Sequence, residues 1–209
     1  MARAQTALEE TWNVITHGLG FLLFVAISIA LFSYADMTKD YVIESLVIYC
    51  TCQLTLYLAS TSYHRAKEGS LKFRLRKLDH ISIYGSIAGT YTPVCLITLE
   101  QSSKWFILFA VWAIAVFGII WKVFFTGKYE AFSSILYLVM GWLIVFDLTN
   151  LIEAFTEFQM QLLITGGIFF TVGIIFYAWN KLYFNHVIWH LFVLGGSLSH
   201  ALMIWYVVV

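Results

Sequence analysis

The chain has 209 residues, of which 61% are apolar and 18% aromatic, and only 11% carry a formal charge. Soluble domains carry roughly 25% charged residues, so the charged side chains here are too few to cover a soluble core. The 12 basic and 12 acidic side chains cancel, and this balance gives no indication of a nucleic acid or an acidic partner. The composition therefore excludes a soluble globule and predicts an integral membrane protein.

Long apolar stretches follow one another along the chain, each close to the roughly 20 residues that a helix needs to cross a bilayer. The first apolar run, Val14 to Tyr34, is longer than the core of a signal peptide, so we expect it to be a retained helix. Pro93 lies inside the third stretch and predicts a local kink. We expect an all-α membrane protein, a single seven-helix transmembrane domain over residues 1–209, with spans at about 13–23, 42–63, 79–99, 105–126, 131–150, 160–180 and 187–209.

The basic residues indicate how the spans are oriented. Of the 12 Lys and Arg residues, all but Lys39 and Lys104 fall on the side that holds the N-terminus. The densest group lies in the loop expected between the second and third spans, from Arg65 to Leu78. Cytoplasmic loops carry the excess of positive charge, so we expect a cytoplasmic N-terminus and an outside C-terminus.

Histidines inside the spans are the strongest functional signal, because ionisable groups in a membrane are costly and commonly functional. His186 and His190 are four residues apart at the start of the last span, so they share one helix face. This is the spacing by which one helical turn offers two nitrogen ligands to zinc. The same pair could instead reach the interface or bond to neighbouring helices.

Topology favours the metal-binding alternative. His64 ends the second span and Asp79 begins the third, so both are expected at the depth of His186 and His190, near the cytoplasmic surface. Three histidines and a water would complete a tetrahedral zinc site of the catalytic kind. Asp79, and Ser60 one turn before His64, would then hold the water or orient a ligand.

The other polar residues receive structural interpretations. His200 is about 15 Å along the helix from His190, too far to be a ligand, and we expect it to line a cavity or bond within the bundle. We expect His17 to have a packing or capping role and His80 to lie at the membrane interface, while Asp147 falls near the outer end of the fifth span, either buried or solvated. Cys50, Cys52 and Cys95 are expected to be unpaired packing residues.

Several of these stretches occur together in one known family. The segment Glu9 to Gly18, the pattern Ser60-x3-His64, the segment from Arg76 to Pro93, and His186-x2-Trp189-His190 followed by His200 resemble the bacterial haemolysin III proteins. That family belongs with the progestin and adiponectin receptors and, more distantly, with the alkaline ceramidases. The resemblance covers nearly the whole chain. It implies zinc held by His64, His186 and His190, a water between the metal and Asp79, Ser60 nearby, and a cytoplasmic N-terminus.

Three functions are compatible with these features. The first is a zinc-dependent hydrolase in a bacterial plasma membrane, with Asp79 and Ser60 as catalytic residues and a lipid amide or ester, such as a ceramide-like molecule, as substrate. The second is a non-enzymatic sensor or regulator of membrane lipid state, in which zinc is structural. The third is a cytolysin, which fits less well because no wide polar face recurs on several helices.

Overall fold

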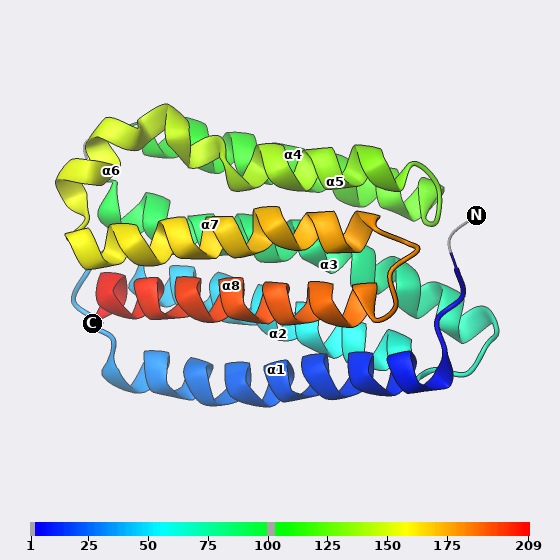
Figure 1. Cartoon of the computed structure of the whole chain (residues 1–209). Helices are drawn as coiled ribbons and strands as arrows, with labels where there is room; N and C mark the ends of the chain where they lie inside the picture. Colours follow the sequence, from blue (N-terminus) through cyan, green and yellow to red (C-terminus); the bar gives the residue numbers. More distant parts are fainter. Residues whose placement is uncertain (1–2, 100–102) are drawn as a thin grey trace.

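The computed structural model describes residues 3–99 and 103–209 as a bundle of helices running side by side (Figure 1). Within these ranges seven segments are helical, long and apolar enough to cross a membrane, as predicted. The N- and C-termini lie at opposite ends of the bundle (Figure 1). The helices are α1 (Ala7–Tyr34), α2 (Val42–Arg65), α3 (Ser70–Pro93), α4 (Lys104–Phe125), α5 (Glu130–Gly141), α6 (Leu148–Ala154), α7 (Glu157–Ala178) and α8 (Asn185–Val208). The α-helices of the described residues number eight because the fifth span, Glu130–Ala154, contains both α5 and α6.

The distribution of polarity is the one expected for a protein dissolved in lipid. Large apolar side chains such as Leu22, Phe124 and Phe146 are exposed on the outer faces of the helices. Polar side chains such as Asn13 and Gln53 are buried between helices, where they can find hydrogen-bond partners that lipid does not offer. The chemistry of the molecule is therefore concentrated in the interior of the bundle.

The first helix starts earlier than its apolar run. Thr6 caps α1 by accepting a hydrogen bond from the Glu9 backbone N–H, and the Glu9 carboxylate accepts one from the Thr6 backbone N–H. This capping box stabilises a polar first turn that hydropathy alone does not reveal. The expected start at residue 13 was therefore too late.

The expected loop from Arg65 to Leu78 is also mostly helix. Helix α2 ends at Arg65 and α3 begins at Ser70, so only residues 66–69 connect them. The basic residues of this segment lie largely on the first turns of α3, where Lys72 and Lys77 reach Glu10 and the Val123 carbonyl. Lys, Arg and Leu are good helix formers, so a helix can continue beyond the apolar part that marks the membrane.

Two spans contain irregular backbone. The third changes to a π-helical turn, Val94–Thr98, directly after Pro93, where we predicted a kink. The fifth, expected as one helix over 131–150, is interrupted by a 3₁₀ segment, Leu143–Asp147, between α5 and α6. The Tyr91 hydroxyl donates to the Gly141 carbonyl and accepts from the Ile144 N–H, each at 3.0 Å. One side chain thus satisfies a backbone group in the last residue of α5 and another inside the 3₁₀ segment.

Helices α7 and α8 pack closely through glycines. A Cβ atom at Gly166 would lie 2.2 Å from the His200 ring, and one at Gly173 would lie 2.9 Å from Trp189. Small residues at helix interfaces let backbones approach in membranes, where packing replaces the hydrophobic effect as the driving force. The close approach fixes α8, which carries three of the six histidines, against its neighbour.

Candidate metal centre

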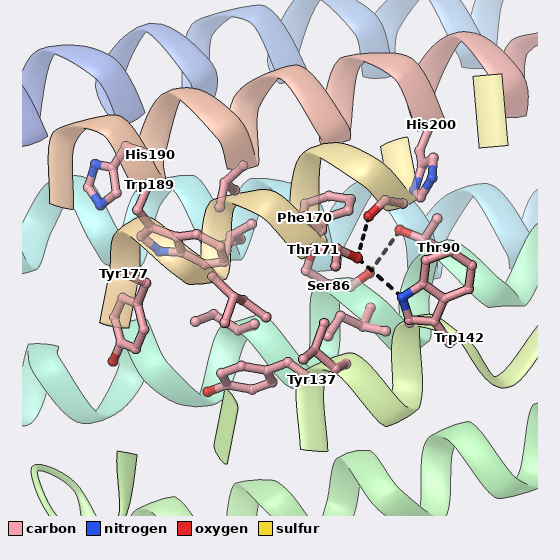
Figure 2. A pocket seen from close by; sticks show the side chains of 18 of the residues that line it. Ser86, Thr90, Tyr137, Trp142, Phe170, Thr171, Tyr177, Trp189, His190 and His200 are labelled. Carbon is pink, nitrogen blue, oxygen red and sulfur yellow. Dashed lines mark hydrogen bonds between the residues drawn. The ribbon is translucent and has the colours of Figure 1, made fainter. Parts of the chain in front are cut away.

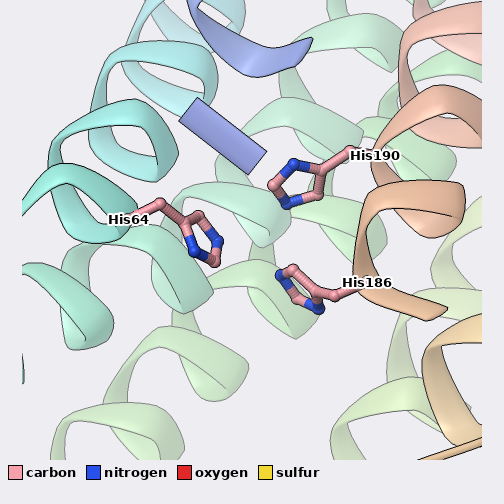
Figure 3. Close-up of side chains that lie close together, drawn as sticks. All are labelled: His64, His186 and His190. Atoms are coloured by element: carbon pink, nitrogen blue, oxygen red, sulfur yellow. The ribbon is translucent and has the colours of Figure 1, made fainter. Parts of the chain in front are cut away.

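Three histidines from two helices meet near the end of the bundle that holds the N-terminus (Figure 3). His64 lies in the last turn of α2, and His186 and His190 lie in the first two turns of α8. The ring centroids are 5.0 Å apart for His64 and His186, 5.1 Å for His64 and His190, and 4.6 Å for His186 and His190. Each ring offers one nitrogen, and these three atoms all lie within 4.8 Å of one another.

The hydrogen bonds around the cluster fit a transition-metal ion. His64 Nε2 is buried without a hydrogen-bond partner among the described residues, while its Nδ1 lies 2.5 Å from Glu10 Oε2. His190 Nδ1 lies 3.2 Å from the Thr16 hydroxyl oxygen. A metal-binding imidazole typically uses one nitrogen for the metal and the other for such a hydrogen bond. Three imidazole nitrogens are a ligand set that suits zinc.

A cavity adjoins the cluster and extends along α8 (Figure 2). His190 lies toward one end of it, and His200 and Trp142 lie toward the other. His186 also lines the cavity. Its volume is about 120 Å³, several times the roughly 10–15 Å³ that a single water needs. Leu56, Ile83, Phe170 and other apolar side chains form most of the wall.

The two residues predicted to be catalytic are in this cavity. Ser60 and Asp79 both line it and are only 1% and 6% exposed. They come from α2 and α3, the helices that also meet at the short connection after His64. The structure therefore places a carboxyl and a hydroxyl group in the cavity that the histidines line; their roles in a reaction remain predictions.

Two further histidines are closer to the site than expected. His80, predicted to lie at the membrane interface, is 6% exposed and lines the cavity. The prediction was wrong because α3 begins nine residues before Asp79, which carries both residues into the bundle. His17 does pack, as predicted, but against the cluster itself: its ring stacks on His190 with the centroids 3.5 Å apart.

The remaining polar candidates lie outside the cluster. His200 Nε2 donates to the Leu163 carbonyl at 3.2 Å, in agreement with the bonding role predicted for it. Asp147 is buried rather than solvated, and it accepts a hydrogen bond from Asn150 at 2.5 Å. Cys50, Cys52 and Cys95 are free thiols, as expected.

Sequence reasoning missed an ion pair beside the cavity. Lys122, fully buried on α4, lies 2.5 Å from Glu130 on α5. The Tyr177 hydroxyl donates to the same carboxylate at 3.1 Å, and the Tyr177 ring lies 5.9 Å from that of His186. Lys122 and Glu130 flank a tight turn, and their opposite charges at that turn are the one signal of the pair in the sequence.

Sequence reasoning also missed the acidic residues that hold the N-terminal segment against the site. Glu9 bonds to Arg3 and accepts from the Phe184 backbone N–H at 2.8 Å, two residues before His186. The bond to Glu9 raises the pKa of the Arg3 guanidinium above its usual value. Glu10 lies between His64 and Lys72. The seven-residue spacing of Glu10 and His17 puts them on one face of a helix, but spacing alone does not tell which helices that face meets.

Comparison with known proteins identifies the family. Residues 5–201 match the family described as Haemolysin-III related. The chain belongs to the haemolysin III family. It is 43% identical over 195 residues to Hemolysin-3 of Bacillus cereus, covering 92% of this chain and 89% of that protein. It is 41% identical over 193 residues to the Hemolysin-3 homolog of Bacillus subtilis (strain 168), covering 92% and 91%.

The similarity extends beyond bacteria. The human Monocyte to macrophage differentiation factor is 28% identical over 215 residues, which cover 96% of this chain and 84% of that protein. The haemolysin III assignment agrees with the resemblance found in the sequence motifs. Together with the seven spans, it establishes an integral membrane protein.

Proposed function

We propose that this haemolysin III protein is a zinc-dependent hydrolase that cleaves an amide or ester bond of a membrane lipid. The observation that carries the proposal is the set of three histidine nitrogens within 4.8 Å of one another, beside a mainly apolar cavity that also holds Asp79 and Ser60. A lone buried histidine has many structural explanations, but three converging imidazoles with a nearby carboxyl group are typical of a catalytic zinc site.

The proposed roles follow from the chemistry of each group. A zinc ion held by His64, His186 and His190 would polarise a carbonyl oxygen and lower the pKa of a bound water toward 7. The Asp79 carboxylate would accept the proton of the attacking water and pass it to the leaving group. The Ser60 hydroxyl would donate a hydrogen bond that orients the water or the substrate carbonyl.

The walls of the cavity favour a lipid substrate. Most of the surface of the lining is apolar, which suits an acyl chain with its carbonyl group at the histidine end. The similarity to bacterial haemolysin III proteins supports a bacterial plasma membrane. We place the N-terminus in the cytoplasm because the basic residues concentrate at that end of the bundle. A reporter enzyme fused after Val209 should then be active only outside; activity confined to the cytoplasm would reverse the orientation.

Replacement of Asp79 tests the hydrolase directly. Asp79→Asn keeps the size of the side chain but removes the base, so it should retain zinc and lose turnover by about 100-fold or more. Asp147→Asn is a matched control, because Asp147 is also buried in the membrane but does not line the cavity. Purified proteins in bilayers would receive ceramides, N-acyl amino acids and phospholipids, and mass spectrometry would measure released fatty acid. Equal release by wild type and Asp79→Asn would refute the assigned role.

A regulatory function is the second candidate, and one observation favours it. The cluster joins α2 to α8, and α1 packs against both of these helices. A bound ion would therefore fasten the beginning of the bundle to its end, as a structural zinc does. In that case wild-type protein should release no fatty acid from any lipid, Asp79→Asn should behave like wild type, and removal of zinc should lower the melting temperature.

A further inference from the structure

Helix α1 contributes no ligand to the histidine cluster, yet it contacts the surroundings of all three histidines. The Glu10 carboxylate bonds to His64, the Thr16 hydroxyl bonds to His190, and the Glu9 carboxylate holds the backbone just before His186. The His17 ring stacks on the ring of His190, with the centroids 3.5 Å apart. The first helix thus lies behind the cluster and supports it.

The contact between Glu10 and His64 is the most direct of these. Glu10 Oε2 lies 2.5 Å from His64 Nδ1, and Glu10 Oε1 lies 2.9 Å from Lys72 Nζ. The His64 side chain is 2% exposed and that of Glu10 is 25% exposed. Lys72 fixes the second oxygen, so the carboxylate has one orientation and presents the first oxygen to the imidazole. Three helices, α1, α2 and α3, meet in this one chain of contacts.

We propose that Glu10 is a positioning residue that prepares His64 to bind metal. Its carboxylate accepts a hydrogen bond from Nδ1–H of His64, which keeps the ring proton on Nδ1 and leaves the buried Nε2 unprotonated and free to bind metal. Without Glu10, the ring could rotate or carry its proton on Nε2, and each change would remove the donor lone pair from the cluster. The inference rests on the proposed metal site, but the contact itself exists independently of any ion.

Glu68 offers a matched control for this role. It also contacts Lys72, at 3.2 Å, but its side chain is 90% exposed. Glu10→Gln and Glu68→Gln therefore each remove one carboxylate from Lys72, and only the first removes the charge beside His64. Glu10→Ala removes the acceptor altogether.

The first measurement is zinc affinity, by competition with a chelator in detergent-solubilised protein. The zinc dissociation constant should rise about 10- to 100-fold in Glu10→Ala and less in Glu10→Gln, and should not change in Glu68→Gln. The visible absorption spectrum of bound Co²⁺, which reports coordination geometry, should change in Glu10→Ala alone. If Glu10 only stabilised the fold, its replacement would lower the melting temperature and leave both the dissociation constant and the spectrum unchanged.

The second measurement needs no metal. In chelator-treated protein, the destabilising effects of Glu10→Ala and His64→Ala should not add, because each removes the same hydrogen bond. The effects of Glu68→Ala and His64→Ala should add. Additivity for Glu10 and His64 would overturn the inference. Wild type that binds no zinc would overturn the metal centre and the role of Glu10 in metal binding together, and coupling between Glu10 and His64 would then report a structural contact alone.

Discussion

The cavity has two ends, and helix α8 contributes a histidine to each (Figure 2). At one end His190 is surrounded by other imidazoles, with His17 stacked on it and the rings of His64 and His186 within about 5 Å. At the other end His200 donates to a backbone carbonyl and packs against Phe170. The two side chains share a helix and a membrane, but they have different partners.

The difference shows what separates a candidate metal ligand from a structural histidine inside the bundle. Contact with the cavity does not separate the two residues, because both line it. They differ in the partners of their ring nitrogens. His200 Nε2 donates to the Leu163 carbonyl on α7. His190 instead contributes one of three imidazole nitrogens that lie within 4.8 Å of one another. A histidine that satisfies a backbone carbonyl has a structural role, because a buried polar group needs a partner.

The largest expected effect separates these two histidines by metal content. His190→Ala should purify with no zinc, because two imidazoles do not hold the ion firmly, while His200→Ala should keep one zinc per chain. Elemental analysis of protein purified without chelators would measure both. Equal zinc in the two variants would remove the contrast between the ends of the cavity.

A smaller effect is expected from packing at the His200 end. Gly166→Ala would place a Cβ atom 2.2 Å from the His200 ring, so the ring or the helix must move. Overpacking of this kind costs about 1–3 kcal/mol. The control is Gly141→Ala, where no atom lies within 4 Å of the added Cβ. Thermal unfolding in detergent would compare them, and Gly166→Ala protein as stable as wild type would show that the α7 and α8 contact is loose.

Much of the fold could be predicted from the sequence because each span carries its own signal. About 20 apolar residues identify a membrane helix without reference to any other part of the chain. The interruption of the fifth span has no such local signal. Its Ile144 N–H bonds to the hydroxyl of Tyr91, which belongs to α3. Nothing in the local sequence around residues 141–147 records that contact.

The candidate site also has some features that the sequence predicts and others that only the packing of the helices determines. The spacing of His186 and His190, and the order of spans that brings His64 to their level, are visible in the sequence, and the structure brings these three side chains together. The place of His80 depended on where α3 begins, which hydropathy does not give. The contact of Glu10 with His64 depended on the rotation of α1 about its own axis, which only packing determines.

The connection between α2 and α8 has a consequence for biogenesis. His64 enters the membrane with the second span to be synthesised, and His186 and His190 enter with the seventh, after four further crossings of the bilayer. The histidine cluster cannot exist in any earlier insertion intermediate, so the proposed metal site is complete only after the seventh span has arrived. Until then α1 and α2 can pair on their own, with Glu10 already beside His64, and wait for the final helix to close the site.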